Sequence, residues 1–167
     1  MKVNMTKGLS IAILIGMSTL IFYGINAYAG QHNKVVITKG FVKDIEVIAT
    51  KNDDFRRVLY TTKQCQLVVM ALKPKEEIGM EAHKSDQFFR VEAGSGVVVI
   101  NDVRTALQAG FAVIIPGGSQ HNIINTGKVP MKLYTIYAPP NHRDGVIHHT
   151  RKEAEADDEH FDGKTTE

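Results

Sequence analysis

Apolar residues from position 58 onward fall into short runs that are rich in β-branched and aromatic side chains. These runs cover residues 57–61, 66–72, 87–93, 96–101, 112–116, 121–125 and 131–138. Glycine, proline, asparagine and aspartate separate them, for example at Gly94-Ser95-Gly96, Asn101-Asp102 and Pro116-Gly117-Gly118. Many short strands at this spacing, with no helical pattern between them, predict an all-β antiparallel sandwich or barrel over residues 58–140.

The segments on either side of this region have a different pattern. Residues 30–57 are mixed, and strand-like pieces at 35–38 and 44–50 predict an arm with short N-terminal strands. Pro139-Pro140 ends the last strand, and residues 141–167 form a tail. Within this tail a short helix is expected after Thr150, which is a good N-cap and has Glu153 three residues later as a capping box.

The first thirty residues resemble an export signal. Lys2 and Lys7 precede an uncharged apolar run, which ends at Ala27-Tyr28-Ala29. A basic start, an apolar stretch and an Ala-x-Ala exit are typical of a cleaved secretory signal peptide, here residues 1–29. The alternative is an uncleaved membrane anchor at residues 8–29, because that stretch is long enough to span a bilayer. Either reading predicts a domain exported to the periplasm or the outside.

Charge and cysteine content narrow the classes of partner. The formal net charge is +2, and residues 1–29 carry two lysines and no acidic residue, so the remaining chain has a net charge of 0. Without a basic stripe interleaved with aromatics, nucleic acid is not an expected partner. Cys65 is the only cysteine and cannot form an intrachain disulfide. Its alternation with Leu67 and Val69 predicts a small buried apolar residue.

The strongest motif is GFAVIIPGGSQHNIIN, which places Gly110, Pro116, Gly118, His121 and Asn125 at fixed spacings. Glycine turns the chain into a buried strand, Pro-Gly-Gly makes a tight hairpin, and the histidine begins the next strand. This pattern resembles the second motif of the cupins at every position. The resemblance implies a cupin-type double-stranded β-helix, a jelly-roll barrel, in a small single-domain protein related to RmlC-like cupins.

The first cupin motif is present in altered form at EAHKSDQFFRVEAGSG, residues 81–96. When its last glycine is aligned with Gly94, Gln87 takes the glutamate position and His83 takes the second histidine position. Glu81 then replaces the first histidine, and Lys75 stands where the motif begins with glycine. The resemblance therefore implies a substituted site, in which one histidine and one glutamate have changed.

Strand geometry places these side chains on one face. Residues two apart on a strand point the same way, so Glu81 and His83 both face inward, and Phe89 and Val91 continue the apolar face. Two imidazoles, a carboxylate and an amide oxygen suit one divalent ion such as Fe, Mn, Ni or Zn. The predicted metal ligands are Glu81, His83, Gln87 and His121. In an alternative arrangement, Glu81 pairs with Arg90 or Lys84 and leaves three weak ligands.

Other polar residues are weaker candidates. Asp86 has the opposite parity and is expected at the surface. The tail histidines could form a lid or wall over the barrel mouth, although exposed loop positions are the favoured interpretation: His142, His148 and His149. Three tyrosines fit core or strand-end positions, and one phenol could act as a proton donor: Tyr60, Tyr134 and Tyr137. His160 is expected in the tail helix without a role.

These features support three hypotheses of function. The first is a metal-dependent enzyme for a small molecule, with dioxygenase-, isomerase- or decarboxylase-like chemistry. The second is a non-catalytic module that binds a sugar or other small ligand. The third is a metal-free, epimerase-like cupin that uses histidine and tyrosine as acid and base. We also expect a homodimer, because small cupins typically pair their sheet edges and an exposed edge is prone to association.

Overall fold

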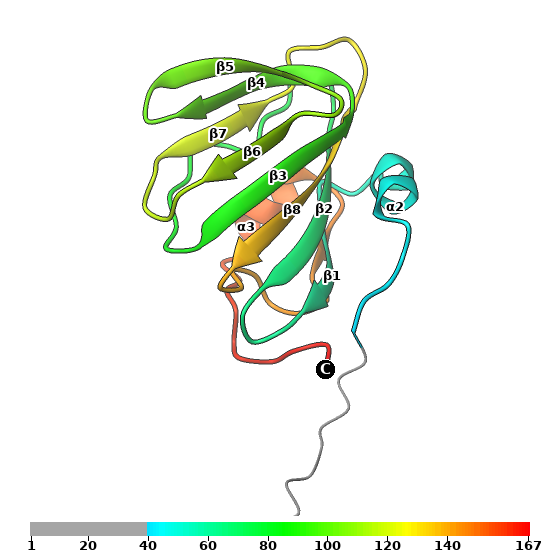
Figure 1. Ribbon diagram of the computed structural model, residues 1–167, viewed down its shortest axis with the longest axis vertical. Helices are drawn as coiled ribbons and strands as arrows, with labels where there is room; N and C mark the ends of the chain where they lie inside the picture. Colours follow the sequence, from blue (N-terminus) through cyan, green and yellow to red (C-terminus); the bar gives the residue numbers. More distant parts are fainter. Residues whose placement is uncertain (1–39) are drawn as a thin grey trace, which may run out of the picture. The chain divides into compact units, whose positions relative to one another are not determined.

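The computed structural model describes residues 40–167 (Figure 1). Nine strands form two sheets, one of six strands in the order β6-β3-β8-β2-β1-β9 and one of three in the order β5-β4-β7. All strand pairs are antiparallel. The strands are β1 (Arg56–Thr61), β2 (Gln66–Leu72), β3 (Asp86–Ala93), β4 (Ser95–Ile100), β5 (Val103–Gln108), β6 (Ala112–Ile115), β7 (His121–Ile124), β8 (Met131–Ala138) and β9 (Ile147–His148). The predicted all-β jelly roll is confirmed.

The two sheets enclose a core of buried apolar residues. On β3 the buried residues Phe89 and Val91 follow Gln87 at intervals of two, which confirms the predicted inward face. Val91 lies opposite Leu133 of β8, and Leu133 lies opposite Met70 of β2, so the same face continues across the sheet. This apolar end leaves the polar side chains to the other end of the barrel.

A row of polar residues crosses the six-stranded sheet at that other end. Thr61 of β1 lies opposite Gln66 of β2, Gln66 opposite Tyr137 of β8, and Tyr137 opposite Gln87 of β3. Directly opposed residues of antiparallel strands point to the same face. All four side chains are buried. The register therefore builds a polar interior from residues that are far apart in the sequence.

Two local predictions are wrong, and the sequence pattern did not indicate one strand. Residues 44–50 fall mainly in a helix, α2 (Ile45–Lys51), because the side chain of Asp44 caps the backbone N–H of Val47. Cys65 is exposed, since it lies in the turn before β2 and the inner face of that strand carries Gln66 instead. Residues 103–108 form β5, whose mostly exposed positions give no apolar alternation. The strand expected at 35–38 lies outside the described residues.

The last part of the C-terminal tail, drawn in red, passes below the lower ends of β8, β2 and β1 (Figure 1). Thr150 caps α3 (Arg151–Ala156) by accepting a hydrogen bond from the Glu153 backbone N–H, as predicted. His160 lies beyond this helix, not within it. The final residues return to the barrel, where the Thr166 N–H donates to the carbonyl of Thr61 at 3.0 Å. Between residues 40 and 167, no helix is long and apolar enough to cross a membrane; the expected leader, residues 1–29, lies outside the described part.

Candidate metal centre

Backbone pairing brings Glu81 and His121 together. Their main chains exchange two hydrogen bonds of 2.9 Å, so the two side chains leave the strands on the same side. The Glu81 Oε1 atom lies 3.4 Å from His121 Nε2. The alternative in which Glu81 pairs with Arg90 or Lys84 is wrong, because Glu81 faces the barrel interior and Arg90 pairs with Glu92 at 3.5 Å. Glu81 thus occupies the position from which it could bind a metal ion.

Backbone carbonyls fix the orientation of both histidine rings. His83 Nδ1 lies 3.0 Å from the carbonyl of Ser85, and His121 Nδ1 lies 2.9 Å from that of Ser119. A carbonyl oxygen can only accept, so each Nδ1 carries the proton and each neutral ring presents a bare Nε2 lone pair. A hydrogen bond from Nδ1 to a backbone carbonyl is common in histidines that bind a metal through Nε2.

Gln87 lies between the two rings. Its Oε1 atom is 2.9 Å from His83 Nε2 and 3.0 Å from His121 Nε2. Its Nε2 donates to the hydroxyl of Thr135 at 3.1 Å, which keeps the amide oxygen turned toward the imidazoles. The opposite amide orientation would donate to both rings and satisfy them without a cation. In the orientation of the structure, three acceptor atoms face one another.

The donor set fits a bound cation. One ligand atom each from Glu81, His83 and His121 lie within 4.8 Å of one another. The Oε1 atom of Glu81 is buried and has no hydrogen-bond partner among residues 40–167. Converging acceptors with no donor between them are unfavourable unless a proton or metal ion neutralises them. Two imidazoles with carboxylate and amide oxygens match divalent transition metals.

The electrostatic environment favours positive charge beside Glu81. Burial would raise the pKa of the Glu81 carboxyl, but the nearby His121 ring, with Nε2 at 3.4 Å, and the charge of Arg56 hold that pKa below its usual value. Burial would likewise lower the pKa of His121, yet its contacts with Glu81 and the Ser119 carbonyl raise that pKa overall. Burial also raises the pKa of Tyr137, so its phenol stays protonated. A metal ion would compete with a proton at His121.

A surface depression of about 410 Å³ lies beside His83, and Gly117 and Gly118 also line it. At Gly117 a Cβ atom would meet the carbonyl of Lys84, so only glycine allows the two loops to approach this closely. Asp86, predicted at the surface, is exposed, and its carboxylate accepts from the Gly117 N–H at 2.8 Å. The Pro-Gly-Gly hairpin therefore forms part of the wall of this depression.

Two motif positions have structural roles. Asn125 is buried and donates to the carbonyls of Leu72 and Val129, which ties the turn before β8 to the end of β2. Lys75, which stands in the glycine position of the first motif, has a φ of 72°. A residue with a Cβ atom thus adopts the left-handed conformation at this position, at a cost in strain.

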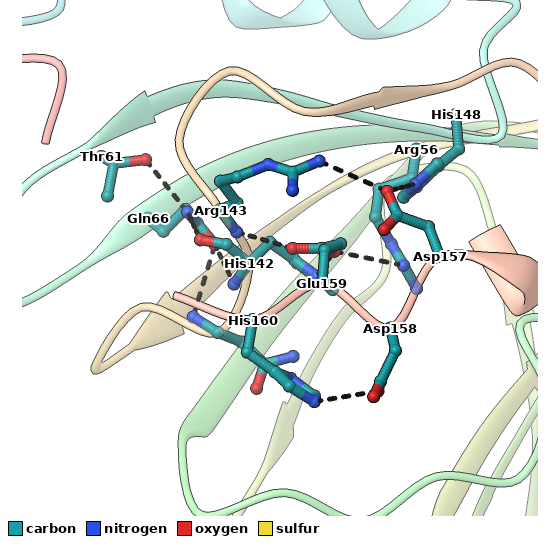
Figure 2. A network of polar contacts seen from close by, with 11 residues as sticks. Arg56, Thr61, Gln66, His142, Arg143, His148, Asp157, Asp158, Glu159 and His160 are labelled. Carbon is teal, nitrogen blue, oxygen red and sulfur yellow. Dashed lines mark hydrogen bonds and ion pairs between the residues drawn. The ribbon is translucent and has the colours of Figure 1, made fainter. Parts of the chain in front are cut away.

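A second cluster of buried polar residues adjoins the centre, and the sequence did not reveal most of it (Figure 2). His142 and His148 are buried, contrary to the expectation of exposed loop residues, whereas His149 is exposed as expected. His142 Nδ1 lies 2.6 Å from Glu159, and Arg56 approaches the same carboxylate at 3.9 Å. Strand parity on β1 could have suggested an inward Arg56, but no motif marks it.

Comparison with known proteins identifies the family. The Cupin_2 model, which describes the cupin domain, matches residues 68–137. The uncharacterized protein YrkC of Bacillus subtilis is 42% identical over 125 residues, which cover 71% of this chain and 67% of YrkC. The uncharacterized protein L612 of Acanthamoeba polyphaga mimivirus is 39% identical over 112 residues, covering 64% of this chain and 70% of L612. The crystal structure of BH2720 from Bacillus halodurans has a TM-score of 0.71 and 39% identity, and the match covers 73% of this chain and 98% of that one.

The chain therefore belongs to the cupin family. Cupins commonly bind a metal ion, and this chain has a possible site for one in Glu81, His83 and His121. The predicted cupin fold is confirmed.

Proposed function

We propose that this protein is an exported cupin that binds one divalent metal ion through Glu81, His83, Gln87 and His121 and uses it to transform a small molecule. The observation that carries the proposal is the buried convergence of acceptor atoms, with the Gln87 oxygen 2.9 and 3.0 Å from two imidazole nitrogens. Fe, Mn, Ni and Zn all suit such a set of nitrogen and oxygen ligands.

A bound divalent ion would supply a Lewis acid, or a site for O₂, for dioxygenase-, isomerase- or decarboxylase-like chemistry. The residues around it have separate tasks. The carbonyls of Ser85 and Ser119 hold the two imidazoles in the tautomer that presents Nε2. Thr135 orients the Gln87 amide, and the buried Phe89 continues the inward face of β3 with an apolar side chain. The protonated Tyr137 is a candidate proton donor within the same interior.

Metal analysis of two histidine variants tests the proposal. After reconstitution with each candidate ion and desalting, we expect one ion per wild-type chain and a large loss in His121→Ala. His149→Ala is the matched control, because His149 is exposed and remote in sequence from both motifs. Less than stoichiometric metal in the wild type with every ion, or equal loss in both variants, would contradict the proposal.

Turnover separates the enzyme from a non-catalytic binding module. A metal-loaded protein that consumes O₂, or converts any member of a panel of small sugars and organic acids, supports the enzyme. Stoichiometric metal and ligand binding without conversion of the panel would instead favour the ligand-binding function.

Export and dimerisation are part of the proposal. N-terminal sequencing of the protein secreted by an expressing bacterium should begin near Gly30, and retention of residues 1–29 would indicate an anchor. For the dimer, β6 is the terminal strand of the larger sheet, and its Ile114 side chain is 71% exposed. Pairing of two such edges would cover apolar surface and unsatisfied backbone groups. Light scattering should give twice the chain mass, and a monomer would contradict this.

A further inference from the structure

The C-terminal tail carries its buried polar residues up to the metal centre. The ring of Tyr137 packs edge-on against His83, with 5.3 Å between centroids, and against His142 of the tail at 5.0 Å. The amide of Gln66 fixes the tail by donating to the His142 carbonyl at 2.7 Å and accepting from the His142 N–H at 2.9 Å. His142 is therefore held one aromatic ring away from a proposed metal ligand.

Arg56 is buried next to this ring without adequate partners. Only 9% of the residue is exposed, and its Nε atom is buried without a hydrogen-bond partner among residues 40–167. Its nearest carboxylate, Glu159, is 3.9 Å away, which is too long for a hydrogen bond. The Glu159 oxygens already accept from His142 Nδ1 and the Arg143 N–H, both at 2.6 Å. Glu159 thus balances the charge of Arg56 but leaves its buried Nε–H donor without a partner.

His142 contributes the complementary acceptor. Its Nδ1 donates to Glu159, so its Nε2 carries the lone pair of a neutral ring. This Nε2 atom is buried and has no hydrogen-bond partner among the described residues. Figure 2 shows His142 and Arg56 approaching the same Glu159 carboxylate from two elements, the tail and β1. The Nε–H donor of Arg56 and the Nε2 acceptor of His142 are therefore both buried without a partner, and both residues contact the Glu159 carboxylate.

We propose that Arg56 and His142 form a substrate-anchoring subsite for a small hydroxycarboxylate, with Arg56 binding the carboxylate and His142 Nε2 accepting a hydrogen bond from the hydroxyl. A planar guanidinium matches a carboxylate with two parallel hydrogen bonds, and a hydroxyl supplies the donor that His142 lacks. The inference rests on the proposed function, because the ligand would be held beside the metal centre.

The charges of the interior agree with an anionic ligand. Arg56 contributes one positive charge, and Glu81 and Glu159 contribute two negative ones. Burial lowers the pKa of His142, which keeps that ring neutral. A divalent ion on Glu81 would leave one excess positive charge, which a monocarboxylate would neutralise. A buried excess charge is costly, so the metal-loaded centre should prefer an anion over its neutral analogue.

Calorimetric titration of the Zn²⁺-loaded protein tests the subsite. Glycolate, the smallest hydroxycarboxylate, should bind at least about 10-fold more tightly than glycolamide, its neutral isostere, and than acetate, which lacks the hydroxyl. Arg56→Gln should weaken glycolate binding by about 10-fold or more, because the charged hydrogen bonds are lost. Arg57→Gln is the matched control, since this neighbouring side chain is half exposed and pairs with Asp54, and it should change binding less than about 2-fold.

The possible failures can be told apart. A wild-type protein that takes up no metal contradicts the proposed function and, with it, the subsite. A metal-loaded protein that binds glycolate and glycolamide alike overturns the subsite alone, as does equal weakening by Arg56→Gln and Arg57→Gln. The comparison of glycolate with glycolamide needs no variant, so the inference stays refutable even if Arg56→Gln does not fold.

Discussion

Replacing Gln87 by glutamate should strengthen metal binding. The substitution keeps the size of the side chain and exchanges a neutral oxygen for an anionic one, between two imidazoles 2.9 and 3.0 Å away. Thr135, which now accepts from the amide at 3.1 Å, can rotate its hydroxyl and donate to the new carboxylate. The change therefore leaves no polar atom newly unsatisfied, and its main effect falls on the charge of the centre.

The size of the gain follows from two opposing terms. Unit charges about 4 Å apart attract by about 4 kcal/mol at an effective dielectric constant of 20, and a divalent ion doubles this. Burying another carboxylate costs several kcal/mol, which offsets most of the attraction. A net gain of about 1.4 to 2.8 kcal/mol corresponds to a 10- to 100-fold lower Kd.

Competition with a chromogenic chelator, at fixed pH, would measure the affinity of Gln87→Glu and wild type. Gln66→Glu is the contrasting control, because Gln66 lies in the same buried row but donates to the His142 carbonyl at 2.7 Å. A carboxylate there would face that carbonyl without a cation, so we expect a stability loss of about 3 kcal/mol with little change in metal affinity. Unchanged or weaker metal binding by Gln87→Glu would refute the reasoning.

Three further predictions concern stability, each measured by urea denaturation. Burial lowers the folded-state pKa of His142, so the contribution of the neutral ring to the free energy of unfolding is complete above the unfolded pKa near 6.5 and is lost as the pH falls below it. Between about pH 7.5 and 5.5, the His142→Gln variant should therefore lose less stability than the wild type. Equal losses would contradict this prediction. Lys75→Gly should stabilise by about 1 kcal/mol by relieving the positive φ, and destabilisation would argue against strain. Gly96→Ala should cost at least about 2 kcal/mol, because its Cβ would collide with the Ile124 carbonyl; a neutral change would show that the strands can separate.

Much of the metal centre could be predicted because two glycine-anchored motifs set its register. The position of Gly94 fixed the parity of Gln87 and Phe89, and a strand period of two then placed both inward. The pairing of Glu81 with His121 was harder to predict, since it depends on a short bridge between segments 40 residues apart. From the sequence, Glu81 could face the metal position or pair with the basic side chain of Arg90 or Lys84. The backbone pairing of Glu81 with His121 turns it toward the interior.

The subsite could not be predicted because its residues have no common period. Arg56 lies on β1, next to the edge strand β9. His142 and Glu159 lie in the tail, whose irregular backbone gives no hydrophobic pattern. Their burial depends on how the tail packs, which is a tertiary effect. The same limit explains α2, where the cap at Asp44 outweighed the strand preference of its β-branched residues.

The most direct test of the proposed centre is a crystal structure of the metal-loaded protein, with anomalous data collected at the absorption edge of the bound ion. We predict one anomalous peak per chain, about 2.0 to 2.2 Å from His83 Nε2, His121 Nε2 and a Glu81 oxygen, with Gln87 Oε1 completing the set. A barrel without a peak, with the Gln87 amide turned to donate to both imidazoles, would contradict the account.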